Sequence, residues 1–139
     1  MKKTLGILTA TAICLAYTLF LTVPVEASYG NPGSIPLAAG PVSATGTSSI
    51  SIRSGNSSTS SPNGSVGLYV SATYWYNENA YKPGATIVVK SESGWASNYN
   101  LAYKGFSAGD YDQSIRIEGY HSASSGGYEA HGNTVYYYN

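Results

Sequence analysis

The sequence contains very few of several residue types on which many small exported proteins depend. Its 139 residues include one cysteine, one methionine and two phenylalanines, and only 10% of them are charged. A single cysteine, Cys14, offers no partner for a disulfide within the chain, so the fold has to be held by burial and hydrogen bonds. The low charge provides no basic surface of the kind that binds nucleic acid or anionic lipid. We therefore expect neither of these partners.

The first 27 residues have the layout of a secretory signal peptide. Two lysines precede an uncharged stretch from Thr4 to Val25, and Val25-Glu26-Ala27 has small residues at the positions that a signal peptidase reads. We expect cleavage after Ala27. Retention as an N-terminal anchor is the alternative, because the apolar stretch is about as long as a membrane-spanning helix. The start of the chain thus predicts a secreted protein of bacterial type.

Cleavage after residue 27 would leave 112 of the 139 residues, which is one domain of ordinary size. Lys2, Lys3 and Glu26 would leave with the signal peptide. The seven basic and seven acidic residues would then become five and six, a formal charge of minus one.

Residues 28–48 are expected to form a flexible arm rich in proline, glycine and serine. Its prolines, at positions 32, 36 and 41, are spaced so that neither a helix nor a strand is expected to run through it. Residues 54–65, SGNSSTSSPNGS, are expected to form a polar loop, because they contain almost nothing that could be buried. The single β domain should therefore cover residues 49–139, with its compact part starting as late as Val66.

From residue 66 onward, apolar and polar residues alternate in the way that predicts β-strands. One expected strand has Leu68, Val70, Ala72, Tyr74 and Tyr76 on one face and Tyr69, Thr73 and Trp75 on the other. Further strands are expected over residues 85–92, 97–105, 111–121 and 128–138, and no apolar run has helical spacing. The pattern predicts an all-β antiparallel sandwich of five to seven strands, immunoglobulin-like or a similar small barrel. Gly109-Asp110-Tyr111 is placed like the corner tyrosine of immunoglobulin-type sandwiches.

Two short motifs could carry chemistry, and we interpret both as turns. GFSAG, residues 105–109, matches the pattern around the nucleophile of some hydrolases, with Ser107 followed by Asp110 or Asp112 and then by His121 or His131. That motif works only between a strand and a helix of a larger parallel sheet, and no helix is expected here.

Asp110 and Asp112 open with the spacing of a calcium loop. The sixth position lacks glycine, and the twelfth is His121 instead of glutamate. We expect Asp110 to cap the turn and Asp112 to point to water. Neither an enzyme nor a cofactor is predicted.

The aromatic residues are the most suggestive feature for binding. Fourteen tyrosines and two tryptophans stand among serine, glycine and asparagine, a composition typical of surfaces that bind sugars or proteins. Many of these rings are needed for the core, since phenylalanine is scarce. Trp75, Tyr81 and Trp95 are the candidate binding residues, because Trp75 lies on the minority face of its strand and the other two lie in turns.

The last residues predict a β-hairpin with a Ser/Gly turn. Pairing Ile117 with Val135 makes Ser125-Gly126-Gly127 a three-residue loop, puts His121 opposite His131, and turns Tyr137 toward the core. Two opposed histidines are a weak metal-site hypothesis. A shift of one residue, to a Gly126-Gly127 turn, would put them on opposite faces and remove the site.

The sequence thus predicts a small secreted protein without catalytic activity that binds cell-wall glycan or an extracellular protein through exposed aromatic rings. A secreted antagonist, such as a bacteriocin-like toxin or an inhibitor, is the first alternative. A hydrolase is the second, and it is disfavoured by the scarcity of groups for acid, base or nucleophilic catalysis.

Overall fold

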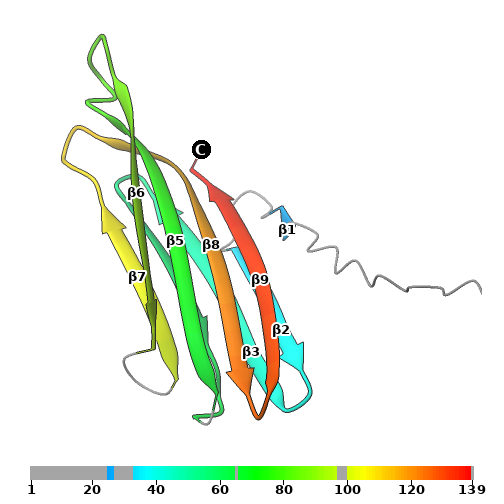
Figure 1. The fold of residues 1–139 in the computed structure, drawn as a ribbon. Coiled ribbons are helices and arrows are strands. Elements are labelled where there is room, and N and C mark those ends of the chain that lie inside the picture. The colour runs from blue at the N-terminus through cyan, green and yellow to red at the C-terminus, as the bar shows by residue number, and fades with distance from the viewer. Residues whose placement is uncertain (1–24, 27–32, 65, 97–99, 139) are drawn as a thin grey trace, which may run out of the picture.

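The protein is a sandwich of two β-sheets in the computed structural model, which describes residues 25–26, 33–64, 66–96 and 100–138 (Figure 1). The first sheet has the strand order β1 (Val25–Glu26), β9 (Tyr128–Tyr137), β8 (Gln113–Ser125), β5 (Gly67–Glu78) and β6 (Thr86–Trp95). The second has the order β2 (Gly33–Ala39), β3 (Val42–Ser51), β4 (Ser54–Ser60) and β7 (Leu101–Ser107). All pairs are antiparallel except β1 with β9. The expected small all-β sandwich is confirmed.

The expected signal peptide, residues 1–27, lies outside the described residues except for the backbone of β1. Within the part of the chain that the structure describes, no helix could span a membrane.

The expected flexible arm is wrong for residues 33–48, which form β2 and most of β3. Pro36 is tolerated because β2 is an edge strand, whose free side needs no backbone donor. Gly40, with φ of 55°, and Pro41 form the tight turn between the two strands. The start of the compact domain is therefore earlier than residue 49, and residues 28–32 lie outside the description.

The expected polar loop is also wrong, because residues 54–60 form β4 in the middle of the second sheet. Ser57 and Thr59 of this strand are fully buried. Their hydroxyl groups make hydrogen bonds inside the sandwich, which removes the cost of burying them. These additional N-terminal strands bring the sandwich to eight main strands, more than the five to seven expected.

The expected faces of β5 are confirmed, since its even-numbered residues from Leu68 to Tyr76 are buried. β6 runs on through Gly94 to Trp95, although the sequence suggests that it breaks after residue 92.

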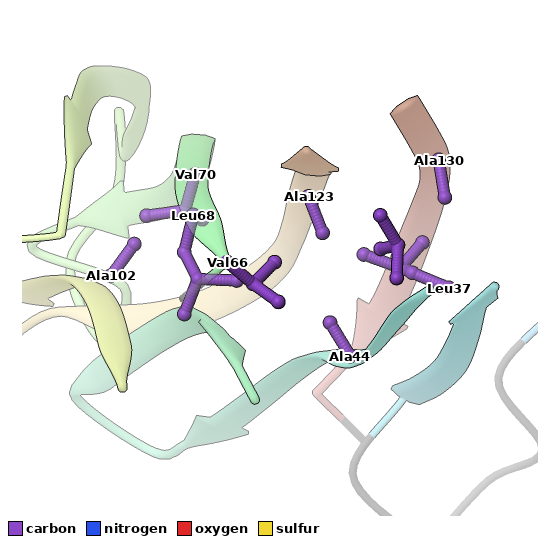
Figure 2. Close-up of a cluster of buried hydrophobic side chains, with 9 residues drawn as sticks. Leu37, Ala44, Val66, Leu68, Val70, Ala102, Ala123 and Ala130 are labelled. Atoms are coloured by element: carbon purple, nitrogen blue, oxygen red, sulfur yellow. The ribbon is translucent and has the colours of Figure 1, made fainter. Parts of the chain in front are cut away.

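The core between the sheets has two apolar parts. The first is shown in Figure 2 and consists of Leu37, Val42, Ala44, Val66, Leu68, Val70, Ala102, Ala123 and Ala130. The second consists of Ala72, Tyr74, Tyr76, Phe106 and Ile117. In the second part the ring of Tyr74 stacks with those of Tyr76 and Phe106, and the ring centroids of each pair are 5.6 Å apart. Tyrosine thus does replace the scarce phenylalanine in part of the core.

The β8–β9 hairpin has a two-residue Gly126-Gly127 turn, and the expected three-residue loop is wrong. Both glycines have positive φ, 58° and 82°, which suits the tight hairpin turns that match the strand twist. Ile117 therefore pairs with Tyr136. Because a one-residue shift turns every side chain to the other face, Tyr136 packs against the core and Tyr137 is 48% exposed. The expected inward position of Tyr137 is wrong.

The loop before β8 is tied by Asp112, and the likeness to a corner tyrosine is wrong. Oδ1 of Asp112 accepts a hydrogen bond from the backbone N–H of Asn79 at 2.9 Å, and Oδ2 accepts one from the N–H of Gly109 at 2.7 Å. These two bonds hold the pKa of Asp112 below its ordinary value. Tyr111 is 64% exposed, with the ammonium group of Lys82 5.5 Å from its ring centre.

Candidate functional site

Four rings lie in a row across the outer face of the five-stranded sheet. This ring row consists of Trp95 on β6, Tyr69 on β5, Tyr120 on β8 and His131 on β9, four strands that lie side by side in Figure 1. Tyr69 pairs with both Trp95 and Ser122, and Ser122 pairs with His131. The ring centroids are 5.2 Å apart for Trp95 and Tyr69, 6.3 Å for Tyr69 and Tyr120, and 6.2 Å for Tyr120 and His131. The strand register therefore brings together rings that are far apart in the sequence.

The rings of the row hold one another in place. Each separation is within the range of packed aromatic pairs, and such contacts limit the rotamers that each ring can adopt. Trp95 is 68% exposed and Tyr120 is 40% exposed, while Tyr69 between them is half-buried. The rings of Trp95 and Tyr120 thus present surface to solvent at positions that are already ordered. This order lowers the conformational entropy lost when a ligand binds.

A shallow groove of about 390 Å³ adjoins Tyr120 on the same face of the sheet. Its lining includes the side chains of Ser71, Thr73, Glu118, Asn133 and Val135. The groove offers hydroxyl, carboxylate and amide groups beside ring surface. Ligands with one apolar face and several hydroxyl groups need this combination, because the apolar face can stack on a ring while the hydroxyls form hydrogen bonds.

The three candidate residues named from the sequence do not come together. Trp95 belongs to the ring row. Trp75 is on the same face but lies six residues from Tyr69 along β5, roughly 20 Å away at the usual rise of a strand. It is half-buried, because the guanidinium group of Arg116 lies 4.1 Å from its ring centre. Tyr81 is 65% exposed, in the turn between β5 and β6.

The two histidines do not form a metal site, and that hypothesis is wrong. His121 pairs with Gly132, and His131 pairs with Ser122, so the histidines lie on opposite faces of the sheet. His131 is exposed, with its Nδ1 3.5 Å from Oε1 of Glu129, while His121 is fully buried between the sheets. Among the described residues, no group of three histidine, cysteine or acidic side chains could hold a metal ion.

His121 is the centre of a hydrogen-bonded cluster that we call the polar bridge. The bridge joins His121 and Thr134 of the first sheet to Ser48, Ser57 and Thr59 of the second. Its bonds are 3.0 Å from Thr59 Oγ1 to His121 Nδ1, 2.8 Å from His121 Nε2 to Thr134 Oγ1, 2.6 Å from Thr134 Oγ1 to Ser48 Oγ, and 2.9 Å from Ser48 Oγ to Ser57 Oγ. On β8, His121 falls between Ala123 of the first apolar part and Ile117 of the second. The bridge thus separates the two parts of the core.

The hydrogen bonds of the bridge assign the tautomer of His121. The hydroxyl of Thr59 donates to the backbone carbonyl of Tyr69 at 2.8 Å, so Thr59 Oγ1 can only accept from His121 Nδ1. Nε2 is then free of a proton and accepts from Thr134. Burial lowers the pKa of His121 to about 4, with a smaller opposing effect from a hydrogen bond with the Ser58 backbone. His121 is therefore a neutral, structural histidine.

The hydrolase motif is not assembled. Ser107 is at the end of β7, paired with Ser54, while His121 is bound within the polar bridge and His131 lies on the outer face of the other sheet. The carboxylate of Asp110 is 93% exposed, 3.6 Å from Arg53, and Asp112 binds backbone N–H groups. The expected roles of the two aspartates are thus reversed.

Sequence reasoning missed Tyr69 and Tyr120 as members of the site. Tyr69 could have been found, because the alternation puts it on the same outer face as Trp75. Tyr120 depended on the hairpin register. Comparisons with family models, with curated proteins and with solved structures found no match to this chain.

Proposed function

We propose that this protein is a non-catalytic extracellular protein that binds a cell-surface polysaccharide on the outer face of its five-stranded sheet. The ring row carries this proposal. It combines exposed ring surface at Trp95 and Tyr120 with an adjoining polar groove. Extracellular placement is the expectation that follows from the N-terminal sequence.

The surroundings of the row favour a glycan over a protein as the ligand. The outer-face residues next to the rings on β5 and β6 are Ser71, Thr73, Ser91 and Ser93. Small hydroxyl side chains of this kind leave the rings standing above their surroundings and supply hydrogen bonds to sugar hydroxyls. The core of a protein–protein interface is usually more apolar than this.

Co-sedimentation with insoluble glycans tests the proposal. Purified protein is mixed with peptidoglycan, chitin and cellulose, and the bound fraction is measured for wild type, for Tyr120→Ala and for the double variant Trp95→Ala/Tyr120→Ala. We expect wild type to sediment with at least one of these glycans. Each lost stacking ring should cost about 1 kcal/mol, so the double variant should bind roughly 30-fold more weakly.

Tyr103→Ala is the matched control. Tyr103 is a tyrosine of similar exposure, 55%, but it lies on β7 of the other sheet. Its loss should leave glycan binding unchanged. Equal binding by wild type and the double variant, or no sedimentation with any of the three glycans, would refute the proposal. The secreted antagonist remains a prediction from the sequence, for which growth inhibition of related bacterial strains is the assay.

A further inference from the structure

β6 is a long edge strand with a free side. It pairs with β5 over ten residues, and among the described residues no strand pairs with its other edge. Eight of its ten residues are exposed. Three of them are large and apolar and share the outer face, namely Ile87 at 65%, Val89 at 51% and Trp95 at 68% exposure. A long, exposed, apolar edge invites pairing with another strand.

β6 lacks proline and a bulge, two of the usual features that prevent such pairing, although it carries two charged residues. It contains no proline, and its register with β5 runs without a bulge from Thr86 to Trp95. Its only two charged residues, Lys90 and Glu92, have opposite signs and lie two positions apart. An antiparallel copy of the same strand would therefore meet unlike charges in a register centred between them.

We propose that β6 pairs antiparallel with β6 of a second copy, in the register centred on Ser91. This register sets Lys90 opposite Glu92 of the partner copy twice, once on each side of the two-fold axis. It also sets Ile87 opposite Trp95 twice, so that the two most exposed apolar residues of the strand lie side by side on the outer face.

The neighbouring registers are less favourable. Centring on Lys90 or on Glu92 would put two like charges directly opposite each other. Sliding one strand by a single position, so that Lys90 faces Ser91 of the other copy, would set outer-face residues of one copy beside inner-face residues of the other. Ile87 and Trp95 would then no longer meet.

The two charged side chains lie on the inner face of β6, where they contact residues of β5 and β7. Lys90 Nζ donates to the carbonyl of Ser107 at 2.8 Å and lies 5.0 Å from the centre of the Tyr76 ring. Glu92 lies 3.9 Å from Lys104 Nζ. Both therefore face the inner side of β6, and the register centred on Ser91 sets each of them opposite the unlike charge of the second copy on that same side.

The paired sheets would form one continuous sheet with both ring rows on the same side, because residues of the same face meet across the axis. A dimer could then bind one glycan surface at two points, which raises its effective affinity. This consequence rests on the proposed function, whereas the pairing itself does not.

Cysteine cross-linking tests the register in a Cys14→Ser background, where the introduced cysteine is the only one in the chain. Ser91 would lie directly opposite its own copy, within the Cα separation that a disulfide allows, whereas Ser93 would lie roughly 13 Å from its copy. Under mild oxidation, Ser91→Cys should form a covalent dimer at least about tenfold faster than Ser93→Cys. A monomeric Ser91→Cys, or equal rates for the two variants, would overturn the proposal.

Charge reversal provides an independent measurement by sedimentation velocity. Lys90→Glu and Glu92→Lys should each shift the protein toward monomer, and the double swap should restore the dimer. Lys82→Glu, in the β5–β6 turn, is the control and should stay dimeric, as should Tyr120→Ala, which tests glycan binding alone. A wild type that is monomeric throughout, or a double swap that stays monomeric although its melting temperature equals that of wild type, would reject the pairing.

Discussion

Titration of His121 should make the stability of this fold depend on pH in a defined window. The folded protein keeps His121 neutral because the polar bridge is buried and already satisfies both ring nitrogens. In a protonated ring Nε2 would carry a proton, so it could no longer accept the hydrogen bond from the Thr134 hydroxyl. No acidic side chain belongs to the bridge to stabilise the charge.

The size of the effect follows from the pKa. In the unfolded chain His121 should titrate near its ordinary value of 6.5, whereas burial lowers the pKa to about 4 in the fold. Between these two values the unfolded state binds a proton that the folded state does not. The free energy of unfolding should therefore be highest above pH 6.5 and fall as the pH decreases to about 4. The total loss is about 3 kcal/mol, since a tenfold difference in proton affinity corresponds to about 1.4 kcal/mol.

Chemical denaturation at a series of pH values from just above 6.5 down to about 4 measures this loss. Wild type should show it, and His121→Asn should be less stable at pH 7 but nearly flat over the same window. His131→Asn is the matched control, because His131 is exposed, and it should keep the wild-type slope. If His121→Asn and wild type lose stability in parallel, burial of a neutral His121 is not the cause.

Two further substitutions test the packing between the sheets and the hydrogen bonds that hold the loop before β8. Gly119→Ala should lower the free energy of unfolding by about 1 to 3 kcal/mol, because the added methyl group would overlap Ser57 and lie 2.7 Å from His121 Nε2. Gly67→Ala is the control and should be nearly neutral in thermal unfolding, because Gly67 is an exposed position of β5. Asp112→Asn should lower the melting temperature at pH 7, because the amide has one acceptor oxygen where the carboxylate has two, so one of the two backbone N–H groups loses its partner. The folded pKa of Asp112 is depressed, so the difference from wild type should shrink as the pH falls below the ordinary carboxyl range. A pH-independent difference would contradict this reasoning.

Local patterns in the sequence were enough to predict the fold class and the inner face of β5. The alternation from Leu68 to Tyr76 reports burial directly, because successive residues of a strand point to opposite faces. The exposure of Tyr81 and Trp95 was also predictable, although Trp95 ends a strand and does not lie in a turn.

The same patterns failed where polar residues are buried. β4 contains no residue larger than threonine and asparagine, so nothing in its own sequence predicts a central strand. Ser57 and Thr59 become suitable for the interior only because His121 and Ser48, distant in the sequence, supply their hydrogen-bond partners.

By itself, therefore, the sequence determined an all-β sandwich with tyrosine in its core and exposed rings on its surface, since these depend on residue type and on a period of two. Only the tertiary structure decided which rings meet. A two-residue turn at Gly126-Gly127, in place of a three-residue loop, sends His121 into the polar bridge and leaves His131 beside Tyr120 in the ring row. The physical reason is that strand register is set by turn geometry and by packing between sheets, and a shift of one residue exchanges the two faces of a strand.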